Sequence, residues 1–169
     1  MAVRRILQLG DPLLRAVSRE VNEASELLQD LQDTLHAFQA SHGFGRGISA
    51  IQIGTPARVI YLEVEGRQYS LVNPHYESLS AETFLLWDDC FSFPDLMVKA
   101  RRSVSVSLAY RDEANIPRTL QASGVLAELI QHEMDHLDGI LAVDRALDRN
   151  SFMTREEWLR QGRPQPAGY

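Results

Sequence analysis

The feature that most constrains this chain is the pentapeptide HEMDH at residues 132–136. Side chains four residues apart lie on one face of an α-helix, about one turn apart, so His132 and His136 can bind the same metal ion. Glu133 is turned by about 100° from His132 and can reach a water molecule on that metal. Two imidazoles with a carboxylate outside the ligand set indicate metal-assisted hydrolysis. The motif therefore predicts a helix with a polar face at a metal site.

The surrounding residues predict where this helix lies. It is expected to open at Ser123-Gly124, to run to about Leu137 and to end near Gly139. One apolar stripe, predicted to pack on a sheet, consists of Val125, Leu126, Ile130, Met134 and Leu137. The adjacent stripe holds Leu129, His132, Glu133 and His136. The histidines should therefore lie beside a buried face, where water access is restricted.

Length and composition indicate one soluble globular domain. A chain of 169 residues can bury a core without disulfide or metal staples. Its 44% hydrophobic and 24% charged residues are ordinary for this class. No apolar run approaches a membrane span, and the N-terminus lacks the apolar segment of a signal peptide. We expect a cytoplasmic protein with a single catalytic domain over residues 1–169 and a loose tail from 162 to 169.

Charge and cysteine content exclude two further classes. The net charge is −6, and Lys99 is the single lysine, so direct nucleic-acid binding is not expected. Arg101 and Arg102 are interpreted as polar partners of nearby carboxylates. The single cysteine, Cys90, excludes an intramolecular disulfide and leaves three roles: a small buried apolar group, a reactive thiol or a metal ligand.

The remaining elements predict an α+β fold. Helical spacing predicts a helix over residues 25–41, and a capping-box pattern at 154–157 predicts a short second one. Between them, β-rich runs predict strands at 59–64, 68–72, 83–87, 98–102 and 104–110. The fold class expected is a single α+β domain with antiparallel sheets packed around the central metal-binding helix.

The third metal ligand is not given by the pentapeptide. After His136 no histidine follows, and the carboxylates are Asp138, Asp144, Asp148, Glu156 and Glu157. Asp138 would point away from the site if the helix continued. Upstream, Cys90 ends a predicted strand, and its thiolate suits zinc or ferrous iron. Two histidines and one cysteine leave a fourth position open for water, as in catalytic metal sites.

Three segments together resemble the peptide deformylases, which remove the formyl group from the N-terminal formyl-methionine of new polypeptides. Residues 45–52, GRGISAIQ, match the first family motif, G-x-G-x-[AS]-A-x-Q. Residues 88–92, DDCFS, correspond to E-G-C-x-S, and residues 131–137, QHEMDHL, match Q-H-E-x-D-H-L in full. The order and approximate spacing also agree, and the resemblance covers roughly residues 1–148.

The resemblance implies a site and a reaction. Cys90, His132 and His136 would hold one divalent metal ion per chain, Fe²⁺ natively, with Zn²⁺, Ni²⁺ or Co²⁺ as substitutes. Metal-bound hydroxide would attack the formyl carbon, and Glu133 would carry the proton to the leaving amine. Gln52 and the backbone N–H of Phe91 would stabilise the charge that develops on the formyl oxygen.

The resemblance also implies partners. The backbone at Gly45, Arg46 and Gly47 would pair with an extended peptide substrate as a strand does. The substrates would be N-formyl-methionyl peptides on nascent chains at the ribosome. A monomer with no membrane association is expected.

Three positions depart from the family pattern. Asp88 stands in place of glutamate and is one methylene shorter, which leaves open its reach to Arg101 or Arg102. Asp89 replaces a glycine, at a cost if that position needs a positive φ. Arg46 replaces an apolar residue; it either points to solvent or shifts the preference for residues after methionine, towards acidic ones. Two alternatives follow: a catalytically impaired metal-binding homologue, and, less favoured, a zincin-type metalloprotease.

Overall fold

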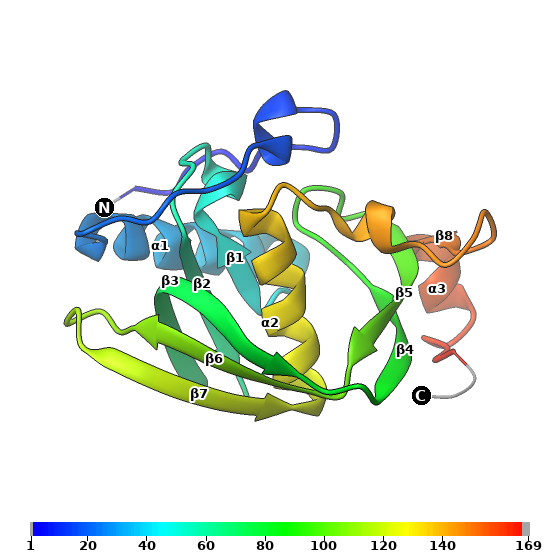
Figure 1. Cartoon of the computed structure of the whole chain (residues 1–169). Coiled ribbons are helices and arrows are strands. Elements are labelled where there is room, and N and C mark those ends of the chain that lie inside the picture. Colours follow the sequence, from blue (N-terminus) through cyan, green and yellow to red (C-terminus); the bar gives the residue numbers. More distant parts are fainter. Residues whose placement is uncertain (1, 167–169) are drawn as a thin grey trace.

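The computed structural model describes residues 2–166, in which one central helix lies between two antiparallel sheets (Figure 1). The central helix is α2, Gly124–Leu137. The larger sheet has the order β1-β2-β3-β6-β7, formed by Gly47–Ser49, Val59–Val64, Arg67–Leu79, Ser105–Arg111 and Pro117–Ser123. The smaller has the order β4-β5-β8, formed by Thr83–Asp88, Leu96–Ser103 and Phe152–Thr154. The α+β class with antiparallel sheets around the helix is confirmed.

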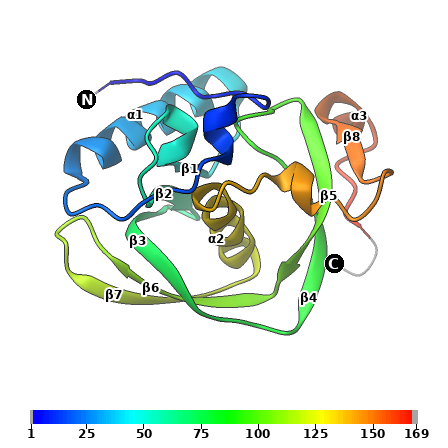
Figure 2. The same cartoon turned by 45° about the horizontal axis from the view of Figure 1, so that its top comes forward.

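Two further α-helices and three 3₁₀ turns complete the described part of the chain. Helix α1, Ser25–His42, packs on β2 from the side opposite α2, as Figure 2 also shows. The short helix α3 is Arg155–Arg160, and the 3₁₀ turns are η1 Pro12–Arg15, η2 Ala50–Ile53 and η3 Ala142–Arg145. Among the described residues, no helix is long and apolar enough to cross a membrane.

Strand β2 explains how the core is divided. Val59 and Tyr61 belong to the apolar cluster with α1, whereas Ile60 and Leu62 belong to the cluster with α2. Successive side chains of a strand point to opposite faces, so a strand covered on both faces is apolar throughout. The hairpin to β3 turns at Glu65 and Gly66, which both have positive φ, as a tight two-residue turn requires.

The structure corrects several expected elements. Strand β3 continues to Leu79, well past the expected 68–72, and β1, β7 and β8 were not predicted. Strand β7 is mostly exposed and polar, so it lacks the alternation that identifies a strand. Val125 was wrongly assigned to the stripe that packs on the sheet; it is 40% exposed and lines a cleft, because the first turn of α2 is not covered.

The C-terminal segment returns to the body of the molecule. Strand β8 pairs with β5, and Thr154 accepts a hydrogen bond from the N–H of Glu157 at 3.2 Å, which confirms the predicted cap. Trp158 Nε1 donates to the carbonyl oxygen of Pro164 at 3.1 Å, so the chain folds back on α3. The predicted loose tail falls partly on residues 167–169, which lie outside the described residues.

Candidate active site

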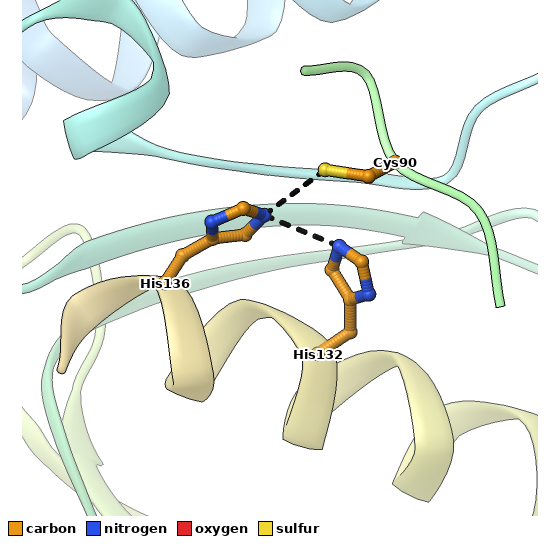
Figure 3. Close-up of side chains that lie close together, drawn as sticks. All are labelled: Cys90, His132 and His136. Carbon is orange, nitrogen blue, oxygen red and sulfur yellow. Dashed lines mark hydrogen bonds between the residues drawn. The ribbon is translucent and has the colours of Figure 1, made fainter. Parts of the chain in front are cut away.

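Three buried side chains form a compact donor triangle. His132 and His136 project from α2 towards Cys90, which follows β4 (Figure 3). Cys90 Sγ and His136 Nε2 are 3.2 Å apart, and the two Nε2 atoms are also 3.2 Å apart. In a tetrahedral zinc site with metal–nitrogen bonds of about 2.0–2.1 Å, neighbouring donor atoms lie about 3.3 Å apart. The structure thus brings together the three predicted ligands at a spacing that fits a cation.

The protonation preferences of these groups also fit a cation. Burial raises the pKa of the Cys90 thiol, and burial lowers the pKa of His136 well below its usual range. His136 Nδ1 and Glu133 Oε2 are buried without a hydrogen-bond partner. A cation at the triangle would reverse the effect on the thiol, because a coordinating sulfur is deprotonated by the metal. The donor set therefore matches a divalent metal with affinity for sulfur and nitrogen.

A carboxylate fixes the orientation of His132. Asp88 Oδ1 accepts a hydrogen bond from His132 Nδ1 at 2.9 Å, which leaves Nε2 facing the other ligands. Burial disfavours the charged imidazole, but the carboxylate and Cys90 together raise the pKa of His132 above its usual range. Although aspartate is shorter than the expected glutamate, Asp88 Oδ2 still accepts a hydrogen bond from Arg102 Nη2 at 2.9 Å. Asp88 therefore reaches Arg102 in spite of its shorter side chain.

The contact to Arg102 belongs to a buried charged network, made of Asp88, Arg102 and Asp135. The Arg102 side chain is only 3% exposed, and its Nη1 donates to Asp135 Oδ2 at 2.5 Å. Arg145 binds the outer side of Asp135 through two hydrogen bonds. The buried network thus connects β5 with β4, which precedes Cys90, and with α2, which carries both histidines.

Glu133 lies next to the ligands and is almost fully buried. Burial raises the pKa of Glu133 to about 7, with the nearby carboxylate of Asp88 adding to the effect. A carboxyl group that gains and loses a proton near neutral pH suits general acid–base catalysis. The structure therefore places Glu133 beside the predicted ligands, and its role in proton transfer stays a prediction.

The two groups predicted to bind the formyl oxygen, Gln52 and the N–H of Phe91, both lie next to Cys90. Gln52 lies in η2, and its Oε1 accepts hydrogen bonds from the N–H and hydroxyl of Ser49. Its Nε2 therefore faces Ser92 Oγ at 3.2 Å and Cys90 Sγ at 3.5 Å. Phe91 follows Cys90 directly, and its ring stacks on that of Phe38 with the centroids 3.8 Å apart.

The motif glycines are required by packing. A Cβ at Gly45, where φ is +124°, would lie 2.4 Å from Cζ of Phe91. A Cβ at Gly47 would lie 2.8 Å from Leu62 Cδ2 and 3.1 Å from Glu133 Oε1. The two glycines therefore let the loop approach both the Phe91 ring and the Glu133 carboxylate.

A cleft of about 610 Å³ opens onto the ligand triangle. Residues 45–47 and the end of β4 line it, together with the polar face of α2 and the C-terminal residues Arg155 and Trp158. Arg46 does not simply point to solvent, because its Nη2 donates to Glu128 Oε1 at 2.7 Å. The structure thus places Gly45, Arg46 and Gly47 in the wall of the cleft.

Asp89 has a partner that the sequence did not reveal. Its carboxylate accepts a hydrogen bond from Arg155 Nη2, and the same guanidinium lies 3.6 Å from the ring centroid of Phe44. Asp89 is not among the described residues with positive φ, so the expected backbone strain does not arise. Arg155 is 66 residues away and gave no signal, whereas Glu128 could have been found, since it lies one helical turn before His132.

Comparisons with known proteins agree with this geometry. The chain matches the family model described as polypeptide deformylase over residues 3–151. Peptide deformylase 1 of Prochlorococcus marinus (strain MIT 9313) is 36% identical over 168 residues, covering 90% of this chain and 85% of that relative. The peptide deformylase of Synechococcus sp. (strain CC9311) is 34% identical over 146 residues, covering 83% of this chain and 71% of the relative.

Solved structures of peptide deformylases share the fold. The enzyme from Thermotoga maritima superposes with a TM-score of 0.80 at 28% identity, covering 88% of this chain and 100% of that one. The enzyme from Synechococcus elongatus, solved in complex with actinonin, gives a TM-score of 0.78 at 30% identity, covering 96% and 91%. With its three motifs gathered at one buried site, the chain belongs to the polypeptide deformylase family.

Proposed function

We propose that this chain is a metal-dependent hydrolase that removes the N-formyl group from the N-terminal formyl-methionine of new polypeptides. The observation that carries the proposal is the buried triangle of Cys90, His132 and His136 with Glu133 beside it, in a chain of the deformylase family. The products are formate and a free N-terminal amine.

Cys90, His132 and His136 would hold the metal. A divalent cation there supplies Lewis acidity, which makes a water molecule nucleophilic at neutral pH. Ferrous iron is the native ion that we propose, with zinc, nickel or cobalt able to replace it, because one thiolate and two imidazoles suit all four.

The other residues move protons and bind charge. Glu133 accepts a proton from the attacking water and delivers it to the amide nitrogen as the carbon–nitrogen bond breaks. Gln52 Nε2, held facing Cys90, donates a hydrogen bond to the formyl oxygen, and the N–H of Phe91 is its second donor. Burial of Glu133 keeps its proton available near neutral pH.

The peptide has two strand edges to pair with. β1 is at the edge of the larger sheet, and β4 is at the edge of the smaller one. Residues 45–47, just before and at the start of β1, and residues 86–88 of β4 line the cleft. An extended peptide can therefore add backbone hydrogen bonds to an open edge.

Two alternatives lose their main support. The impaired homologue depended on the changes at Asp88 and Asp89, but Asp88 still contacts both His132 and Arg102, and Asp89 is paired. A zincin would take a ligand after His136, yet within residues 2–166 the metal-binding group uses Cys90 instead.

The substrate suggests a cellular setting. Formylated N-termini arise at translation, so we propose action on nascent chains at the ribosome, in the cytoplasm. A monomer stays our prediction, since the cleft described is complete within one chain.

Formate release tests the proposal. Protein loaded anaerobically with Fe²⁺ should release formate from formyl-Met-Ala-Ser, and Glu133→Ala should keep the metal while activity falls by about 10²–10⁴-fold. Cys90→Ser should lose the metal. No formate from wild-type protein that holds one metal per chain would overturn the proposed reaction.

A further inference from the structure

One arginine of the C-terminal segment contacts two walls of the cleft, residues 44–47 and residues 86–91. Arg155 is the first residue of α3, and its backbone N–H donates to the carbonyl oxygen of Asp95 at 2.8 Å. Its Nη2 donates to the carboxylate of Asp89, and its guanidinium lies 3.6 Å from the ring centroid of Phe44. Arg155 therefore joins the glycine loop to the segment that holds the cysteine ligand.

The shape of an arginine side chain allows both contacts at once. A guanidinium is planar, so its N–H groups donate along its edge while its face can lie on an aromatic ring. Arg155 donates to Asp89 and, through Nε, to the carbonyl oxygen of Pro94 at 2.6 Å, while it lies over Phe44. The side chain is 15% exposed. These contacts fix its position more firmly than a single ion pair would.

The glycine loop is also anchored on its other side. Gln39 Nε2 donates to the carbonyl oxygen of Gly45 at 3.0 Å, and the N–H of Glu63 donates to the carbonyl oxygen of Arg46 at 2.7 Å. These bonds hold the loop on α1 and β2, away from residues 86–91. Arg155 adds a polar connection to that opposite wall.

The distance between the two walls matters for an extended peptide. Neighbouring strands lie about 4.8 Å apart, so a peptide that pairs with β1 and β4 at once needs about 10 Å between them. A displacement of about 1 Å where a substrate is positioned can lower the rate by about 10²-fold. A side chain that connects the walls keeps this distance fixed before the peptide binds.

We propose that Arg155 is a positioning residue for the peptide substrate, because it holds Asp89 and Phe44 together and so sets the distance between the walls. This inference rests on the proposed deformylation. Arg155 acts on the part of the peptide that follows the formylated methionine, and not on the metal or on proton transfer. The family match ends at residue 151, so this contribution comes from the segment beyond it.

The test compares two substrates of different length. Formyl-Met-Ala-Ser can pair with both walls, whereas formyl-methioninamide ends after its first residue. KM and kcat are measured by formate release from the iron-loaded protein. Arg155→Met removes both contacts and keeps an unbranched side chain. The matched control is Arg160→Met, which changes an exposed arginine of α3 that does not line the cleft.

The expected result depends on peptide length. In Arg155→Met, kcat/KM for formyl-Met-Ala-Ser should fall about tenfold, mainly through a higher KM, because binding along the walls is weakened. The value for formyl-methioninamide and the metal content should stay at the wild-type level, as should all values in the control. Phe44→Leu removes the ring but leaves the pair with Asp89, so its fall should be smaller; it serves if Arg155→Met does not fold.

Each outcome bears on a different claim. An unchanged value for formyl-Met-Ala-Ser in both Arg155→Met and Phe44→Leu, with formate still released, overturns the inference and leaves the proposed function standing. Equal falls for both substrates would mean a general loss of structure, which also overturns it. A fall in Arg155→Met with none in Phe44→Leu would mean that Arg155 binds the peptide itself instead of positioning the walls. No formate from the wild-type protein with either substrate overturns the proposed function as well.

Discussion

Two groups of charges surround the ligand triangle, and they are paired differently. In the buried network, Arg102 is 3% exposed and is shared by the carboxylates of Asp88 and Asp135. On the cleft side, Arg46 is 40% exposed and forms an ion pair with Glu128. Asp89 and Arg155 form the second cleft pair, at 31% and 15% exposure. The network keeps all its charges from water, whereas each cleft pair leaves one charge partly accessible, Arg46 in the first and Asp89 in the second, although Glu128 itself is only 8% exposed.

The two groups of charges therefore differ in position: the buried network supports the metal ligands, whereas the cleft pairs line the space that a substrate would occupy. A buried charge cannot be left alone without a large penalty, so the network fixes Asp88 and through it His132. A partly exposed pair contributes little to stability, because water and salt compensate its charges. The Asp89–Arg155 pair should therefore contribute less to stability than the buried network does.

The largest expected effect is that of Arg102→Met. It removes the partner that two buried carboxylates share, so that Asp135 keeps only Arg145 and Asp88 keeps only His132, and should lower the free energy of unfolding by about 3–5 kcal/mol. Urea denaturation measures it, with Arg101→Met as the matched control, since Arg101 is the exposed neighbour on β5. Similar losses in both variants would contradict the distinction between buried and exposed charges.

Asp88→Asn should act on the metal. The amide keeps the shape but loses the charge that holds His132, so metal affinity should fall about 10–100-fold. Competition with a chelator measures this, and Asp89→Asn is the control, one residue closer to the ligand but paired on the cleft side. Equal losses in the two variants would mean that proximity to Cys90 matters more than the contact to His132.

The pH profile tests burial at Glu133. Its deprotonated form accepts the proton from water, so kcat/KM should fall about tenfold per unit as pH drops below its pKa. Burial, together with the nearby carboxylate of Asp88, raises that pKa to about 7, and a nearby cation lowers it, so the acid limb should lie at or below pH 7. Formate release from pH 4.5 to 8 measures it; activity that rises on acidification would refute the role.

The smallest effect is expected for Asp89→Gly, which restores the family residue. Loss of the partly exposed pair with Arg155 should change stability by no more than about 1 kcal/mol, with the metal content unchanged. Urea denaturation and metal analysis measure both quantities. A loss as large as that of Arg102→Met would show that this cleft pair also supports the ligands.

Sequence reasoning reached the parts of the site that depend on local periodicity. The helix of His132 and His136 followed from spacing, and Cys90 from the lack of a later ligand together with the family motifs. The reach of Asp88 to Arg102 could not be predicted, because it depends on the register of β4 against β5. Val125 was misplaced because helical spacing does not say which turns of a helix are covered.

The C-terminal residues that line the cleft have a consequence for the synthesis of the protein itself. The family match ends at residue 151, yet Arg155 contacts Asp89 next to the cysteine ligand, and β8 pairs with β5. All three motifs are translated before these residues are. A chain still attached to the ribosome can thus have its ligands in place while one side of its cleft is missing. The cleft is complete only after residues 155–165, which contribute to its lining, have been made.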